Sequence, residues 1–130
     1  MYSAKLLDHF EHPRHAGDLA AANARVRVEN PACGDILELA AEVRDGVIHA
    51  IGFRAKGCVP AMACGSAISG LIQGRRIAEI LSIRNEDVLR EVSGVPQASS
   101  HAVHLALDAL AELYKSALQS STSAESRSTL

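Results

Sequence analysis

The chain has 130 residues, a size that fits one domain with one hydrophobic core. Its 13 basic and 15 acidic side chains give a formal charge of −2, and aromatic residues make up only 3% of the sequence. These values argue against a nucleic-acid-binding protein, which needs a basic surface or aromatic side chains on which bases stack. No apolar run approaches the roughly 20 residues that span a bilayer. The N-terminal segment lacks the continuous apolar stretch of a signal peptide, so we expect a cytoplasmic protein without membrane contact.

The cysteines argue against a disulfide framework. Three cysteines, Cys33, Cys58 and Cys64, cannot all pair within one chain. In a reducing cytoplasm, free thiols serve as metal ligands or nucleophiles, or they lie buried as small hydrophobic residues. Each of the three is therefore a candidate ligand, a candidate nucleophile or a core residue.

The first part of the chain predicts one helix and a sheet. Apolar residues at helical spacing predict a helix over residues 4–11, and residues 17–24 are interpreted as a connector. Apolar and polar residues then alternate, which predicts strands at residues 25–29, 36–43 and 47–56. Between the last two strands, Asp45-Gly46 predicts a type I′ hairpin turn, because both central residues of that turn need positive φ.

The second part of the chain predicts helices. Pro60 suits the first turn of a helix that runs to about Gln73, and the small residues in its middle let another element approach closely. Shorter helices follow at residues 77–81 and 85–92, and an apolar stripe predicts a last helix over residues 101–119. The expected fold is therefore α+β, a three-stranded antiparallel sheet packed against helices. It forms one domain over residues 1–119, followed by a disordered tail over residues 120–130.

Two of the cysteines follow strands whose C-terminal ends are expected at the same end of this sheet. Cys33 comes after the first strand and Cys58 after the third, and in an antiparallel meander these two loops can meet. Asp35 lies two residues after Cys33 and adds a carboxylate. Cys58 also precedes a helix N-terminus, whose partial positive charge favours the thiolate. Cys64 falls within the helix, where a buried and inert thiol is expected.

One histidine is expected close to the end of the sheet that carries Cys33 and Cys58. His101 lies at the junction between a loop and the last helix, so its side chain can contact a neighbouring loop. His104 lies one turn later and is interpreted as part of a solvated helix face. His9, His12 and His15 belong to the N-terminal segment and are expected at the surface.

Four short motifs of the chain can be compared with those of known families; they lie at residues 5–14, 31–35, 53–58 and 100–101. In this order and at these intervals, they resemble the NifU/IscU-like iron–sulfur cluster scaffold proteins, over nearly the whole chain. The resemblance implies a three-stranded antiparallel sheet covered by helices. It also implies a transient cluster, built with sulfur from a cysteine desulfurase and passed to apo-proteins that need it.

The resemblance also implies a ligand set. By position, Cys33 and Cys58 match the first two family cysteines, Asp35 matches the family aspartate, and His101 matches the histidine before the third cysteine. At the third cysteine, which serves the family as sulfur acceptor and cluster ligand, this chain has Ala102. It also lacks the Leu-Pro-Pro-Val-Lys segment that many members offer to an Hsp70 chaperone, so chaperone-assisted release is not expected.

Two sulfurs, one oxygen and one imidazole suit tetrahedral zinc, whereas a [2Fe–2S] cluster usually takes more thiolate. The leading hypothesis is a scaffold of iron–sulfur cluster assembly, not an enzyme, that holds iron, zinc or a transient [2Fe–2S] cluster. The alternative is a degenerate member of the same fold, a zinc-stabilised interaction module. A third is a thiol enzyme with Cys58 as nucleophile and His101 as base. The native metal, the acceptor proteins and a homodimer sharing one cluster stay open.

Overall fold

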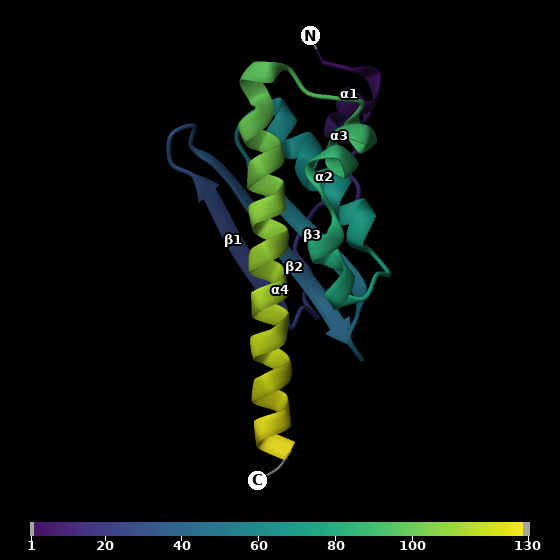
Figure 1. The fold of residues 1–130 in the computed structure, drawn as a ribbon, viewed down its shortest axis with the longest axis vertical. Helices are drawn as coiled ribbons and strands as arrows, with labels where there is room; N and C mark the ends of the chain where they lie inside the picture. The colour runs from purple at the N-terminus through teal and green to yellow at the C-terminus, as the bar shows by residue number, and fades with distance from the viewer. Residues whose placement is uncertain (1, 129–130) are drawn as a thin grey trace.

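The computed structural model describes residues 2–128, with side chains described as far as residue 119. Its elements are α1 (Ala4–Glu11), β1 (Ala24–Asn30), β2 (Asp35–Arg44), β3 (Val47–Lys56), α2 (Val59–Ile72), the 3₁₀ helix η1 (Ile77–Ser82), α3 (Asn85–Val92), the 3₁₀ helix η2 (Gln97–Ser99) and α4 (Ser100–Ser128). The predicted order of one helix, three strands and further helices is confirmed (Figure 1). The tail expected over residues 120–130 lies outside the part of the chain with described side chains and stays a prediction.

The sheet is an antiparallel meander in the order β1-β2-β3, as predicted. Asn30 pairs with Asp35 and Ile36 pairs with Lys56, so the β1–β2 turn and the end of β3 lie at the same end of the sheet. At the opposite end of the sheet, Asp45 and Gly46 form the β2–β3 turn. Their φ values are 53° and 74°, which confirms the predicted type I′ turn.

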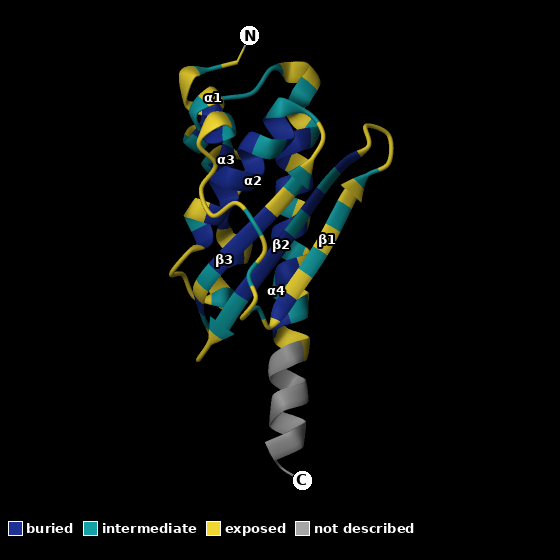
Figure 2. Ribbon diagram, turned by 180° about the vertical axis from the view of Figure 1, so that it is seen from behind, coloured by how far each residue is buried: buried dark blue, intermediate teal, exposed yellow. Residues whose placement is uncertain are grey.

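Helices cover one face of the sheet and leave the other open (Figures 1 and 2). The helix α4 packs mainly on β1 and α2 packs on β3, while α1 and α3 pack on α2. Apolar side chains from the covered face meet those of the two helices in one hydrophobic core: Leu37, Leu39, Ile51, Phe53, Ile68, Ile72, Val103, Ala106 and Leu110. Among the described residues, no helix combines the length and apolar character needed to cross a membrane.

The small residues of α2 let the sheet approach the helix backbone, as predicted. A Cβ atom at Gly65 would lie 2.9 Å from the ring of Phe53 and 3.1 Å from the side chain of Leu37. Any larger residue there would force these two core side chains to move.

The connector before β1 contains no helix or strand over residues 17–23, as predicted, but the residue just before it pairs with the sheet. Ala16 forms a parallel bridge with Phe53, where Gly17 donates its N–H to the Phe53 carbonyl at 2.8 Å. The chain then passes close over the sheet, because a Cβ atom at Gly52 would lie 2.5 Å from the Gly17 carbonyl oxygen. A bridge of this length leaves no alternating pattern in the sequence.

His9 is buried, so its predicted place at the surface is wrong. Only 6% of the residue is exposed, and its Nδ1 lies 2.8 Å from the Ser66 hydroxyl oxygen in α2. That oxygen also accepts the Arg14 backbone N–H at 2.8 Å. Because the Glu91 carboxylate that faces Nε2 can only accept, the proton of neutral His9 lies on Nε2, and the Ser66 hydroxyl donates to Nδ1. The Nε2–H of this neutral tautomer then faces Glu91 of α3 at 3.5 Å. His9 therefore joins three helices.

This network predicts a loss of stability in mild acid. Burial, with the nearby Arg14 charge, lowers the pKa of His9 below its ordinary value of 6.5. Because an unfolded histidine keeps a pKa near 6.5, the unfolded chain binds more protons just below that pH. The stability due to neutral His9 is complete above pH 6.5 and is lost as the pH falls through the folded-state pKa. We expect the free energy of urea unfolding to fall as the pH drops below about 6.5, and to fall less in His9→Gln; equal slopes would contradict this reading.

Candidate metal centre

Three separate elements bring Asp35, Cys58 and His101 together. Asp35 is the first residue of β2, Cys58 is the N-cap of α2, and His101 lies in the first turn of α4. The sheet register places the start of β2 beside the end of β3, from which the chain reaches Cys58 through Gly57. The ligand atoms of these three residues all lie within 4.8 Å of one another. We call this group the donor cluster.

The donor cluster has the dimensions of a tetrahedral metal site. The Asp35 Oδ2 lies 3.1 Å from His101 Nε2 and 3.5 Å from Cys58 Sγ, and Cys58 Sγ lies 3.7 Å from His101 Nε2. Zinc bonds of about 2.3 Å to sulfur and about 2.0 Å to nitrogen or oxygen, at tetrahedral angles, would place such donors about 3.3–3.6 Å apart. One ion can therefore contact all three atoms with little movement.

Gly57 fixes the position of the carboxylate. Its φ is 143°, and a Cβ atom at this residue would lie 2.1 Å from Asp35 Oδ1. Without that atom, Asp35 Oδ1 accepts the Cys58 backbone N–H at 3.1 Å. Asp35 is only 2% exposed, so this bond and the contact with His101 hold a carboxylate that has little water around it. The one signal of this role that is visible in the sequence is a glycine directly before Cys58.

The helix N-terminus favours the Cys58 thiolate as predicted, but other groups outweigh it and the pKa of Cys58 is raised. Burial raises the pKa of Cys58 above its ordinary value, and the Asp35 carboxylate adds to the rise. The backbone N–H of Ala61, at the start of α2, lowers the pKa as expected of a helix N-terminus, but this effect is outweighed. Without a bound cation, Cys58 is therefore a neutral thiol at neutral pH.

These environments predict an order of thiol reactivity in the metal-free protein. Cys33 is exposed, Cys58 is half-buried with a raised pKa, and burial raises the pKa of Cys64 to about 12. At mildly alkaline pH, iodoacetamide should modify Cys33 first, Cys58 more slowly and Cys64 only after unfolding. Peptide mass spectrometry measures the order, and a Cys58 that reacts fastest would show that it is an activated nucleophile.

Cys33 lies apart from the donor cluster. It is exposed in the turn between β1 and β2, where the Asn30 carbonyl accepts the backbone N–H groups of Cys33 and Gly34 at 3.2 and 2.7 Å. Among the residues with described side chains, the group within 4.8 Å contains Asp35, Cys58 and His101 but not Cys33. The structure thus brings together three of the four predicted ligands, and the role of Cys33 stays a prediction.

Cys64 and Ala102 both belong to the core. Cys64 is 0% exposed within α2, which agrees with the expected buried thiol. Ala102, directly after His101, is 1% exposed and packs in the same apolar cluster. Neither residue offers a ligand to the donor cluster.

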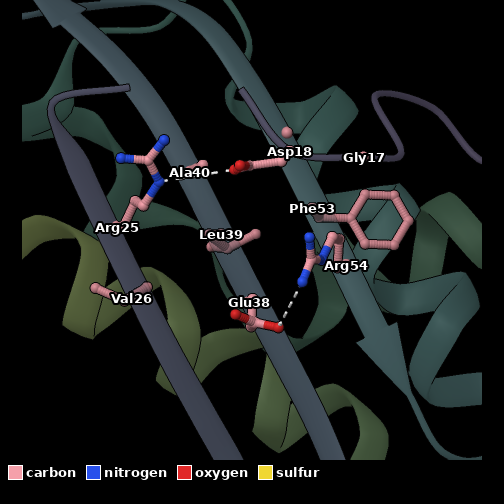
Figure 3. A pocket seen from close by; sticks show the side chains of 10 residues that line it. Gly17, Asp18, Arg25, Val26, Glu38, Leu39, Ala40, Phe53 and Arg54 are labelled. Atoms are coloured by element: carbon pink, nitrogen blue, oxygen red, sulfur yellow. Dashed lines mark ion pairs between the residues drawn. The ribbon is translucent and has the colours of Figure 1, made fainter. Parts of the chain in front are cut away.

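The open face of the sheet has a hollow of a different kind (Figure 3). Its volume is about 200 Å³, and its lining contains no cysteine or histidine. Arg25 faces Asp18 at 3.6 Å and Arg54 faces Glu38 at 3.9 Å, so its charges are paired with each other. Among the residues with described side chains, the donor cluster is the one place where three metal-binding ligand atoms lie within 4.8 Å of one another.

Fold and site together define an α+β domain with sulfur, oxygen and nitrogen donors at one end of a three-stranded sheet. The model of the NifU-like N-terminal domain matches residues 1–120, and the chain belongs to this family. It is 37% identical over 110 residues to the iron–sulfur cluster assembly scaffold protein IscU 1 of Archaeoglobus fulgidus, covering 85% of this chain and 72% of that protein. It is 35% identical over 113 residues to the IscU scaffold protein of Haemophilus influenzae, covering 84% and 89% of the two chains.

Solved structures confirm the fold. A scaffold protein for the SUF system from Fervidobacterium islandicum superposes with a TM-score of 0.73 at 15% identity, over 87% of this chain and 96% of that chain. A NifU-like N-terminal domain from Brucella abortus gives a TM-score of 0.60 at 22% identity, over 91% and 82% of the two chains. The arrangement of one sheet and its covering helices is therefore the family's arrangement.

Proposed function

We propose that this protein is a cytoplasmic scaffold on which an iron–sulfur cluster is assembled and from which the cluster passes to apo-proteins. The donor cluster of Asp35, Cys58 and His101 is the observation that carries this proposal. Family membership and the IscU relatives support it. The cluster or its iron is cargo, so the protein acts by holding and releasing it and not by chemical turnover.

Each proposed ligand has a distinct role. Cys58 supplies a thiolate once the cation displaces its proton, and His101 supplies nitrogen from a half-buried side chain. Asp35 supplies a hard oxygen, which binds iron or zinc less firmly than sulfur and so favours exchange. Cys33 supplies a second thiolate from its exposed turn, where it is open to a sulfur donor. We propose a cysteine desulfurase as that donor.

Anaerobic reconstitution tests this function. With ferrous iron, cysteine, a cysteine desulfurase and a thiol reductant that converts its persulfide sulfur to sulfide, the wild-type protein should develop the visible charge-transfer absorption of an iron–sulfur cluster. Cys58→Ser should abolish it, and Cys33→Ser should strongly reduce it, whereas His12→Gln, which changes an exposed histidine outside the donor cluster, should not change it. A wild-type protein that stays colourless would contradict cluster assembly.

A zinc-stabilised interaction module is the second candidate. Two observations favour it: the distances within the donor cluster fit one tetrahedral ion, and Ala102 replaces a thiolate that a larger cluster would use. Metal analysis of protein purified without added iron separates the two candidates. One tightly held zinc, together with failed cluster reconstitution, supports the module.

The geometry argues against a thiol enzyme. Cys58 Sγ and Asp35 Oδ2 both face the same nitrogen of His101, Nε2. In a nucleophile–histidine–acid triad, the acid orients the ring through the opposite nitrogen, which leaves the first free to take the proton. The raised pKa of Cys58 also argues against a reactive thiolate nucleophile. The three side chains are better suited to bind one cation together.

A further inference from the structure

A groove leads along α4 to the donor cluster. It lies between the end of β1 and the first turns of α4 and has a volume of about 450 Å³. His101 belongs both to its lining and to the donor cluster, so the groove opens onto the cluster.

The groove carries further metal-binding groups that the proposed function does not use. His104 and Asp108 line it from α4, and Glu29 lines it from β1. Spacings of three and four residues place His101, His104 and Asp108 along one edge of the helix. Imidazole and carboxylate are donors that divalent iron and zinc accept.

The charge of the groove favours cations. Glu29 and Asp108 are the charged residues in its lining, and both are acidic. Arg27 faces Glu29 at 3.9 Å and offsets much of its charge, so the acidic character of the groove comes mainly from Asp108. The hollow on the opposite face of the sheet, by contrast, holds Arg25 and Arg54. A cleft lined by one sign of charge concentrates ions of the other sign and speeds their association.

The exposed side chains of the groove suit transient binding of a cation and not stable binding. His104 and Asp108 are exposed, and within the described residues only the donor cluster has three ligand atoms within 4.8 Å. A cation held by one or two exposed groups exchanges quickly with water. The next donor along the helix edge is His101, which already belongs to the preorganised site.

We propose that this groove is the entry route for divalent cations, in which His104 and Asp108 capture an ion and transfer it to His101 of the donor cluster. The proposal rests on the proposed function only in requiring that the donor cluster binds a metal ion. The transfer is an exchange of ligands, without a change of oxidation state.

Cobalt(II) is the probe, because its bond to the Cys58 thiolate gives a near-ultraviolet charge-transfer band that stopped-flow mixing can follow under anaerobic conditions. In the double variant His104→Gln/Asp108→Asn, the second-order rate of cobalt loading should fall roughly threefold to tenfold. The final absorbance and the equilibrium affinity should match the wild type. The matched control, His12→Gln/Glu112→Gln, removes one exposed histidine and one acidic residue of α4 outside the groove, and should load at the wild-type rate.

Three outcomes would overturn the entry route while leaving the proposed function intact: an unchanged loading rate, an equal loss of rate in the control, or a lost affinity in the groove variant. The last would make the groove residues ligands of the final site or parts of its framework. A donor cluster that binds no metal ion would look different, because cobalt would then give no thiolate absorption in the wild type or the same absorption in Cys58→Ser; failure of cluster assembly shows only in the reconstitution experiment.

Discussion

Gly57→Ala is expected to destroy metal binding and to destabilise the fold. The new methyl group would lie 2.1 Å from Asp35 Oδ1, at a residue whose φ of 143° suits glycine. Relief requires the Asp35 carboxylate to leave the Cys58 N–H, although it is buried and close to His101. Backbone strain and one lost charged hydrogen bond together predict a loss of about 2–4 kcal/mol in unfolding free energy. Metal affinity should fall by roughly 100-fold or more, since the oxygen donor no longer faces the other two.

Gly46→Ala is the matched control for this substitution. Gly46 also has a positive φ, of 74°, but a Cβ atom there meets nothing within 4 Å. Both variants carry backbone strain, and only Gly57→Ala displaces a donor. Titration calorimetry with zinc and urea unfolding measure the two effects. If both variants keep wild-type zinc affinity, Gly57 does not position Asp35.

Zinc is expected to raise the melting temperature of the metal-free protein by roughly 10–20 °C. One ion would join the starts of β2, α2 and α4, elements that are distant in the sequence. A ligand at 1,000 times its dissociation constant stabilises the folded state by about 4 kcal/mol, and a domain of this size converts each kcal/mol into several degrees. A chelator should reverse the shift.

Variants assign this stabilisation to the donor cluster. Cys58→Ser and His101→Gln should lose most of the shift, and His12→Gln should keep it. Cys33→Ser reports whether the exposed thiol joins the site, because the shift then falls to an intermediate value. Differential scanning calorimetry gives the melting temperatures, and a full zinc shift in Cys58→Ser would place the zinc elsewhere.

Much of the fold could be predicted because its signals are local. The alternation over β2 and β3 and the Asp45-Gly46 turn are each set by neighbouring residues, and they fix the meander. The burial of His9 could not be predicted in this way. Its partners, Ser66 and Glu91, lie in other helices, and nothing near His9 in the sequence indicates them.

In the candidate site, too, some features could be predicted from the sequence and others depend on contacts between distant segments. The positions of Asp35, Cys58 and His101 followed from topology and from the resemblance to a family, and the structure brings the three together. The raised pKa of Cys58 did not follow, because a helix N-terminus is visible in a sequence whereas burial beside a carboxylate is not. The same holds for Gly57, whose role depends on a cross-strand contact with Asp35.

X-ray absorption at the zinc edge tests most directly whether Asp35, Cys58 and His101 form one metal centre. The zinc-loaded wild type should show sulfur at about 2.3 Å and nitrogen or oxygen at about 2.0 Å, with an imidazole signal from His101. Cys58→Ser should lose one sulfur from the first shell, and His101→Gln should lose the imidazole signal. A first shell of oxygen and nitrogen alone in the wild type, or a sulfur count unchanged by Cys58→Ser, would contradict the assignment.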